Sequence, residues 1–321
     1  MMKVVKFNPD AFLQIKHYRQ QAHKPRHLIC FKQWTSEMVM DIINSAINLK
    51  HSIGDTHNKR MDILKDSKVM ILQELNEPVL NMAVSKAATF LGAYDVNIVD
   101  HLIWDNNYIG KVFSLMADVI FVATATHMCV QRFADQASVP VLCMRSRTHA
   151  SIQSLATIMT IIEEYGSMQN VNVAYMGHAH PVLNSYLLLC PMLGANIRFR
   201  CCCKKQTGVS PLLYKASEEL TCQTHTESKE CMRKSQVLSN ATVIISGPST
   251  NKEESKEFQI NVREIQKNTS AKWIYFHTCP RGKEVDDDLF DHCNSRTFNS
   301  FQNMQYIAAA LMANAVKGYK F

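Results

Sequence analysis

Long apolar runs are missing from this chain of 321 residues. The longest, including 186–195 and 306–316, stay well below the roughly 18 residues that a membrane-spanning helix needs, so no membrane partner is expected. Glycine and proline are also scarce, at 10 and 9 residues, which excludes a fibrous or low-complexity protein. Because 46% of the residues are hydrophobic and 20% are charged, the chain can form about two globular domains.

Excess charge is missing from most of the chain. Seven basic residues and one acidic residue precede Glu37, so this short segment carries +6 of the net charge of +7. The nearly neutral remainder lacks the basic surface of a nucleic-acid binder, and no nucleic acid is expected as a partner. The acid-poor start is typical of a mitochondrial presequence, which predicts the mitochondrial matrix. It has few arginines and no serine before Ser36, so a disordered basic tail on a cytoplasmic protein is the alternative.

No apolar signal segment is found, and the eleven cysteines are an odd number. Both features favour a reducing compartment in which the thiols stay free.

The apolar periodicity alternates between that of strands and that of helices. Strands are predicted at 68–72, 96–99, 117–123, 139–143, 171–176, 196–200, 241–246 and 273–276. Helices are predicted at 35–50, 79–90, 130–137, 151–165, 182–193 and 302–316, with 210–230 mainly helical. This alternation predicts an α/β fold with parallel sheets, in two domains because the pattern restarts after the long helix 151–165. Sites in such folds lie just beyond the carboxyl ends of strands.

Three stretches resemble the ornithine carbamoyltransferase family. One runs from Met116-Ala-Asp-Val-Ile through 134–141 and Gln153 to 160–165, and a second places Gly177 ahead of Leu183-Asn-Ser. The most specific is Phe276-His-Thr-Cys-Pro-Arg with the acidic stretch that follows it, which is similar to the family's His-Cys-Leu-Pro signature. The resemblance covers essentially the whole chain from Arg26.

The resemblance implies a domain plan and an activity. After a tail or presequence at 1–25, it implies a carbamoyl-phosphate-type domain at 26–150 and an ornithine-type domain at 151–301. The helix 151–165 links the two domains, and a C-terminal helix at 302–321 packs on the first domain. The family transfers the carbamoyl group of carbamoyl phosphate to ornithine, giving citrulline, as a homotrimer without a cofactor.

The positions at which the family holds phosphate carry unsuitable residues. Its Ser-Thr-Arg-Thr-Arg after the first strand corresponds here to Glu77-Pro78-Val79-Leu80-Asn81. A dianion needs cations and free helix-start donors, but this stretch has no arginine and Pro78 removes a donor. Glu77 adds a like charge, which at ~4 Å costs several kcal/mol at intermediate dielectric.

Other family positions of the first domain have changed as well. The arginine after the Met-Ala-Asp strand falls on Ala123. The His-Pro-x-Gln motif keeps only Gln153, with Ala150 in place of its histidine. The resemblance therefore leaves a vestigial phosphate region.

The positions at which the family binds its amino-acid substrate have diverged in the same way. The family's Asp-Gly-Asn-Asn is His178-Ala179-His180-Pro181, and its Asp-x-x-x-Ser-Met falls on 247–252. There Gly247 replaces the carboxylate, and Asn251 and Lys252 complete the stretch. The signature cysteine falls on Thr278, and the late arginine of the final helix falls on Met304. The remaining residues of this vestigial amino-acid region are His277, Cys279, Pro280 and Arg281, of which Arg281 is the last matching phosphate cation.

Histidines recur just after the predicted strands. His178, His180, His277 and Cys279 have the residue types of a transition-metal site. However, His277 is the family's own residue and the others replace lost polar groups, so we expect no metal.

The sequence thus predicts a non-catalytic homologue, since no replacement arginine stands at the lost phosphate positions. Such a protein would act by binding a small anionic or amino-acid ligand, or as a homotrimer or a hetero-oligomer with an active paralogue. One alternative is a divergent transferase with a changed amino-acid substrate, working through His178, His180 and His277. A storage or structural protein is a third class.

Overall fold

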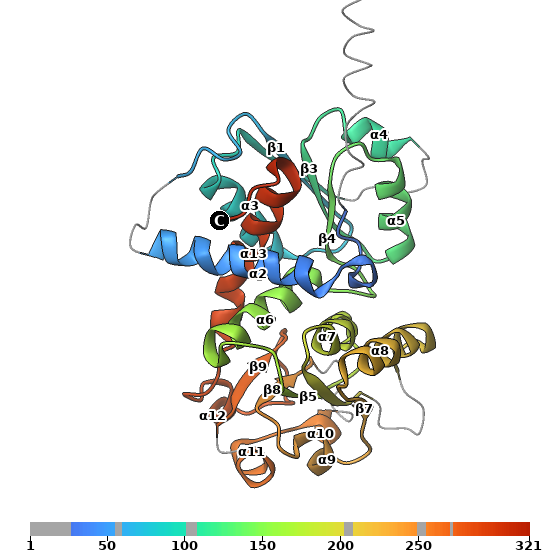
Figure 1. The fold of residues 1–321 in the computed structure, drawn as a ribbon, viewed down its shortest axis with the longest axis vertical. Coiled ribbons are helices and arrows are strands. Elements are labelled where there is room, and N and C mark those ends of the chain that lie inside the picture. Colours follow the sequence, from blue (N-terminus) through green and yellow to red (C-terminus); the bar gives the residue numbers. More distant parts are fainter. Residues whose placement is uncertain (1–26, 55–59, 101–107, 202–207, 249–254, 270–271) are drawn as a thin grey trace, which may run out of the picture.

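The computed structural model describes residues 27–54, 60–100, 108–201, 208–248, 255–269 and 272–321. Figure 1 shows two layered α/β bodies joined by helix α6 (Ser151–Tyr165), with the C-terminal helix α13 (Thr297–Lys317) running back toward the first. This arrangement confirms the predicted fold class. None of the described helices is both long and apolar enough to span a bilayer.

The first domain is built on a four-stranded parallel sheet in the order β2-β1-β3-β4. Its strands are β1 (Lys68–Gln73), β2 (Asp95–Asp100), β3 (Val119–Ala123) and β4 (Val141–Arg145). Its helices are η1 (Phe31–Gln33), α2 (Ser36–Gly54), α3 (Pro78–Phe90), α4 (Ile109–Phe113) and α5 (His127–Gln136). Strand β3 is buried at every residue because helices cover both faces of the sheet, as parallel sheets require.

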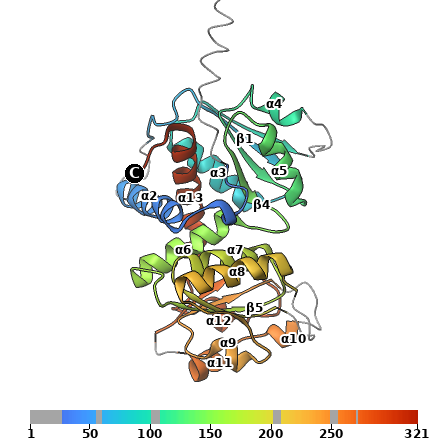
Figure 2. The same cartoon turned by 45° about the vertical axis from the view of Figure 1, so that its right-hand side comes forward.

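The second domain has a five-stranded parallel sheet in the order β7-β6-β5-β8-β9. Its strands are β5 (Asn172–Met176), β6 (Asn196–Arg200), β7 (Ser228–Glu230), β8 (Val243–Ser246) and β9 (Ile274–His277). Its helices are α7 (Pro181–Met192), α8 (Pro211–Thr224), α9 (Lys234–Leu238), α10 (Ser255–Phe258), α11 (Val262–Asn268) and α12 (Asp287–Phe290). In Figure 2, α7 and α8 cover one face of this sheet and α9 and α11 the other.

Several boundaries differ from the sequence prediction, and two of the differences have a clear structural cause. The stretch 210–230 is not helical to its end, because His225 adopts the left-handed conformation (φ 55°) after α8 and β7 then pairs with β6. Helix α13 begins at Thr297 instead of 302, where the Thr297 hydroxyl accepts a hydrogen bond from the backbone N–H of His277 (3.0 Å). The final helix is therefore attached to the second sheet at its start and to the first domain along its length.

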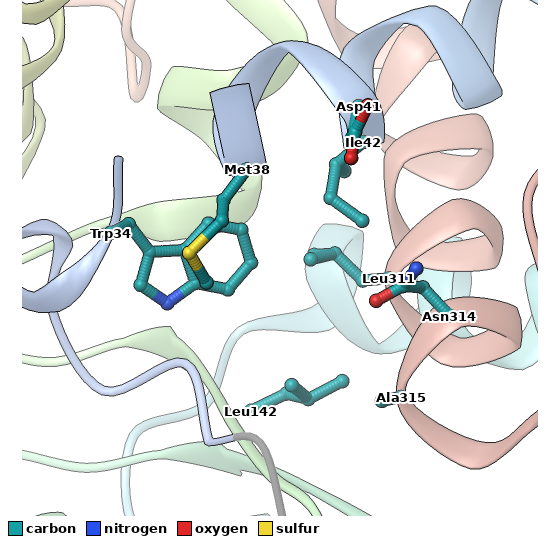
Figure 3. A pocket seen from close by; sticks show the side chains of 8 residues that line it. All are labelled: Trp34, Met38, Asp41, Ile42, Leu142, Leu311, Asn314 and Ala315. Carbon is teal, nitrogen blue, oxygen red and sulfur yellow. The ribbon is translucent and has the colours of Figure 1, made fainter. Parts of the chain in front are cut away.

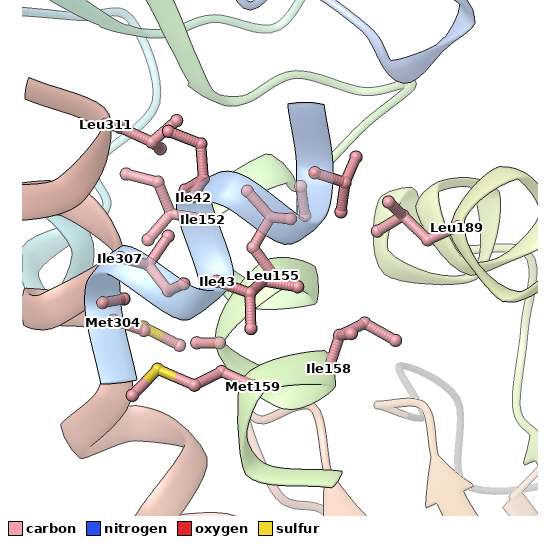
Figure 4. Close-up of a cluster of buried hydrophobic side chains, with 14 of the residues drawn as sticks. Ile42, Ile43, Ile152, Leu155, Ile158, Met159, Leu189, Met304, Ile307 and Leu311 are labelled. Carbon is pink, nitrogen blue, oxygen red and sulfur yellow. The ribbon is translucent and has the colours of Figure 1, made fainter. Parts of the chain in front are cut away.

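The largest core lies where α2, α6 and α13 meet. Figure 4 shows their apolar side chains interleaved, and Met304 is among them with 2% of its surface exposed. The position at which the resemblance implies an arginine is therefore part of the core.

A polar network crosses the same junction. The Lys50 ammonium donates to Glu163 (2.7 Å) and to the Asn303 side-chain oxygen (3.0 Å), while the Asn303 amide donates to Thr160 and Glu163. These four side chains join α2, α6 and α13. A small apolar pocket of about 30 Å³ lies at the outer end of this junction, between Trp34, Met38 and Leu142 and helix α13 (Figure 3).

Candidate functional site

The segment that resembles the phosphate-binding stretch follows β1 and starts helix α3. Pro78 occupies the first helical turn and Glu77 is the N-cap residue, but the Glu77 side chain makes no capping hydrogen bond. Val79 is exposed, whereas Leu80 and Asn81 are buried. At the same edge, Ala123 ends β3 and pairs in register with Gln73 of β1 and Arg145 of β4. Three chain segments thus meet at the carboxyl ends of this sheet.

Arg145 is the functional residue that the sequence analysis missed. Its Nη1 lies 2.6 Å from Oε1 of Glu77, and both side chains are mostly buried. Burial raises the pKa of the Glu77 carboxyl above its ordinary value, and the positive charge of Arg145 opposes that rise. Arg145 lies outside every family motif. Its position at the end of a strand adjoining this edge was the one available signal.

Arg145 also reaches the second domain. Its Nη2 lies 3.5 Å from Nε2 of His180, whose Nδ1 accepts from the backbone N–H of Val182 (3.3 Å) and so caps α7. Burial, and then the charge of Arg145, lower the pKa of His180 to about 3. His180 is therefore a neutral imidazole at neutral pH. The contact brings a first-domain cation and a second-domain histidine together across the domain boundary.

Acidic side chains lie at the carboxyl ends of the neighbouring strands β1 and β2. A cavity of about 220 Å³ at the ends of β1 and β2 is lined by Gln73, Glu74, Leu75, Asn76 and Asp100. Glu74 accepts hydrogen bonds from the Thr124 hydroxyl (2.8 Å) and the Ala125 N–H (2.9 Å), which fixes its carboxylate at this edge. Two carboxylates in one small cavity repel a phosphate dianion.

The start of α6 is engaged in structural bonds. The backbone N–H of Ala150 donates to the Ser185 hydroxyl (3.2 Å), and the Gln153 amide donates to the backbone oxygen of Thr278 (2.8 Å). Gln153, the retained residue of the His-Pro-x-Gln motif, thus ties α6 to the loop after β9. Its amide N–H is committed to that loop.

Gly247 stands where the resemblance implies a carboxylate, and the structure leaves no room for one. A Cβ at this position would lie 2.2 Å from the Tyr175 hydroxyl oxygen, and the Gly177 backbone is close behind. That hydroxyl donates to the backbone oxygen of His178 (3.0 Å), and Tyr175 is fully buried. Asn251 and Lys252 lie outside the described residues.

His277 is held in the loop that resembles the family signature. Its Nδ1 accepts from the backbone N–H of Cys279 (2.9 Å), so its proton is on Nε2, which donates to Glu284 Oε1 (2.8 Å). Both ring nitrogens are therefore used inside the protein. Burial raises the pKa of Cys279 to about 11, which keeps it a neutral thiol.

The other residues of this region point to different neighbours. Thr278 donates to the backbone oxygen of Ser246 (3.2 Å), and Pro280 is exposed. Arg281 pairs with Asp287 and lies 4.6 Å from the centre of the Phe290 ring. Arg281 is thus committed to α12.

The four residues considered as metal ligands do not form one cluster. His178 packs edge-on against Phe258, with ring centres 4.8 Å apart, whereas His180 faces Arg145. His277 and Cys279 lie together in the loop after β9. Across the described ranges, no three histidine, cysteine, aspartate or glutamate side chains are grouped closely enough to hold a metal ion.

Known proteins share this fold and much of its length. Residues 169–315 match the family model described as aspartate/ornithine carbamoyltransferase, Asp/Orn binding domain. The chain is 26% identical to an ornithine carbamoyltransferase from Thermococcus kodakarensis, with 92% of this chain and 98% of that protein covered. It is 22% identical to a mitochondrial ornithine carbamoyltransferase from Aquarana catesbeiana, covering 92% and 88%. The solved ornithine carbamoyltransferase from Pyrococcus furiosus superposes with a TM-score of 0.84 at 22% identity, covering 92% and 98%.

Proposed function

Because the chain belongs to the aspartate/ornithine carbamoyltransferase family, we propose that it is a member that does not transfer carbamoyl groups. It acts instead by binding a small ligand or by associating with other chains. The relatives are named as ornithine carbamoyltransferases at low identity, so the proposal depends on the residues of the site.

The ion pair of Glu77 and Arg145 is the observation that carries this proposal. Arg145, a cation at this edge of the sheet, already has a carboxylate at 2.6 Å. Incoming carbamoyl phosphate would have to break that pair, and the cavity at the ends of β1 and β2 carries the carboxylates of Glu74 and Asp100. Losing one preorganised donor to a transition state costs about 10²–10³ in rate, and several are missing here.

The amino-acid side supports the same proposal. An attacking amine has to be oriented and relieved of a proton. The position that would supply the carboxylate is Gly247, and the Tyr175 hydroxyl fills the adjacent space. This side therefore provides no base at that point.

These contacts favour a non-catalytic protein over a transferase that works through His178, His180 and His277. Of the three histidines, only His180 faces Arg145, while His277 uses both nitrogens within its own loop. A base shared among the three would require them to converge.

The test is turnover by the purified full chain. We expect no citrulline above a buffer blank when carbamoyl phosphate and ornithine are supplied, with an active ornithine carbamoyltransferase as positive control. Phosphate release is followed in parallel with a mixture of amino acids in place of ornithine. Turnover that disappears on unfolding the protein would contradict the proposal, and turnover with another amino acid alone would favour the divergent transferase.

Self-association is the second part of the proposal. Large apolar side chains are exposed on α3 and β2 of the first domain, namely Val79, Met82 and Ile98. Exposed apolar surface of this kind can serve as an interaction surface when chains associate. We expect a homotrimer, or a hetero-oligomer with an active paralogue.

The mitochondrial matrix is the proposed location. Its support is the basic, acid-poor sequence before Glu37 and the likeness to a relative named as mitochondrial. Residues 1–36 fused to a fluorescent protein should direct it to mitochondria. A diffuse cytosolic signal would favour the basic tail.

A further inference from the structure

We infer that Glu77 acts as a tethered anion, whose carboxylate occupies the place of a free anionic ligand on Arg145 and so blocks it. The inference rests on the proposed function, because it concerns a site that no longer turns over carbamoyl phosphate. In this site, the side chain of Glu77 occupies the guanidinium group of Arg145 that would otherwise bind an anion from solution.

The direction of the Glu77 side chain is the first support. An N-cap side chain that carries an oxygen, most often a short one such as aspartate, can accept a hydrogen bond from the first backbone N–H groups of its own helix. The Glu77 carboxylate makes no such bond with α3, although this helix is 13 residues long. It lies instead on the Arg145 guanidinium, at a distance typical of a strong charge-assisted hydrogen bond.

The surroundings of Arg145 are the second support. Its neighbour from the second domain is His180, which is neutral and cannot balance a positive charge. Its Nε is buried and has no hydrogen-bond partner. If Glu77 lost its charge, Arg145 would be a half-buried cation with unused donors, which is costly unless another anion takes its place.

Because Glu77 belongs to the same chain as Arg145, its carboxylate competes favourably with a free anion for the guanidinium group. A group attached to the same chain acts at an effective concentration of millimolar or more, without losing translational freedom on binding. A free anion must overcome that advantage.

The experiment is titration calorimetry of the full chain with inorganic phosphate and, separately, sulfate at constant ionic strength. We expect no saturable binding by the wild type at millimolar anion. Glu77→Gln keeps the shape of the side chain and removes its charge. We expect this variant to bind phosphate and sulfate at least about tenfold more tightly than the wild type does. The double variant Glu77→Gln/Arg145→Gln should lose that binding.

Asp135→Asn is the matched control, because it removes an exposed carboxylate on α5 that accepts a hydrogen bond from Gln131 and does not contact Arg145. It should behave like the wild type. Circular dichroism and thermal melting check that each variant is folded. Should Glu77→Gln not fold, Glu77→Asp shortens the tether by one methylene and should bind anion more weakly but measurably.

Equal anion affinity in the wild type and the folded Glu77 variant would overturn the inference, as would binding that survives the loss of Arg145. Citrulline formation by the wild type would contradict the proposed function instead. If the wild type forms no citrulline and the Glu77 variant binds no more anion than the wild type, the role of Glu77 as a tethered anion would be contradicted and the proposed function would stand.

Discussion

Gly247 shows how one missing side chain limits the chemistry of a site. A Cβ placed there meets the Tyr175 hydroxyl at 2.2 Å, and Tyr175 is fully buried. The space that a catalytic carboxylate would need is thus filled by a phenol. Restoring the carboxylate has to displace a packed aromatic ring.

We therefore predict that Gly247→Ala lowers the free energy of unfolding by about 1–3 kcal/mol, the usual cost of overpacking a core. Gly247→Asp should cost more, since it also buries a charge, and it should not restore citrulline formation. Urea denaturation measures the loss. Adding Tyr175→Phe removes the closest atom and should recover part of it. A Gly247→Asp protein as stable as the wild type would show that the Tyr175 ring yields easily.

His149 is a second residue whose environment has a measurable consequence. It is 2% exposed, and burial, followed by the positive charges of His127 and Lys32, lowers its pKa to about 3. The folded protein keeps it neutral, while the unfolded chain takes up a proton below the ordinary pKa of 6.5. The stability from this residue is therefore complete above pH 6.5 and is lost as the pH falls toward 3.

We predict that the free energy of unfolding decreases by about 2 kcal/mol from His149 between pH 7 and pH 5, at about 1.4 kcal/mol per pH unit. His180 is lowered in the same direction and adds to the slope. In His149→Gln the decrease should be smaller by about that amount, as measured by urea denaturation at the two pH values. His51→Gln, at an exposed position on α2, is the control. An unchanged slope in His149→Gln would contradict the low pKa.

At the scale of elements, the junction of α2, α6 and α13 depends on one amide. Asn303 is fully buried and contacts Lys50, Thr160 and Glu163, which come from the other two helices. We predict that Asn303→Ala lowers the free energy of unfolding by about 2–4 kcal/mol, because its polar partners stay partly buried without it. Asn314→Ala on the same helix should cost much less. Similar losses in both variants would show that apolar packing alone holds the junction.

The sequence was most informative where local signals and tertiary structure agree. Helix α6 has the predicted bounds because Gly166 follows it in the left-handed conformation (φ 79°), a position that glycine favours. Strand β6 was also predicted in full, since its apolar residues alternate. The error after Thr224 has a tertiary cause, because β7 is a strand only through its pairing with β6.

The site was less predictable because its decisive contact joins distant residues. The sequence identified Glu77 as an unfavourable charge, but its partner Arg145 is 68 positions later and in no motif. Only the order of the strands brings β4 close to the segment after β1. The same holds for Tyr175, whose hydroxyl fills the space beside Gly247 through the pairing of β5 with β8.

At the scale of the whole molecule, we predict a homotrimer of three chains of 36.5 kDa each, measured by light scattering at micromolar concentration. Met82 on α3 and Leu212 on α8 are equally exposed, at 73%, and so provide a matched pair. Met82→Asp should weaken association because it places a charge on the apolar first-domain surface, whereas Leu212→Asp should not. A monomeric wild type would contradict this, as would equal effects of the two substitutions.

The course of helix α13 affects how this protein is made. Its last residues are needed by the first domain, where α13 packs on α2 and α3 and Phe321 donates its N–H to the Ser45 hydroxyl (2.9 Å). A ribosome adding about 5–20 residues per second needs roughly 10–35 s to go from the end of β4 to Phe321. Throughout that time the nascent first domain lacks the helix that covers it. The half synthesised first is therefore finished last, and nascent-chain chaperones have the longest access to its uncovered apolar face.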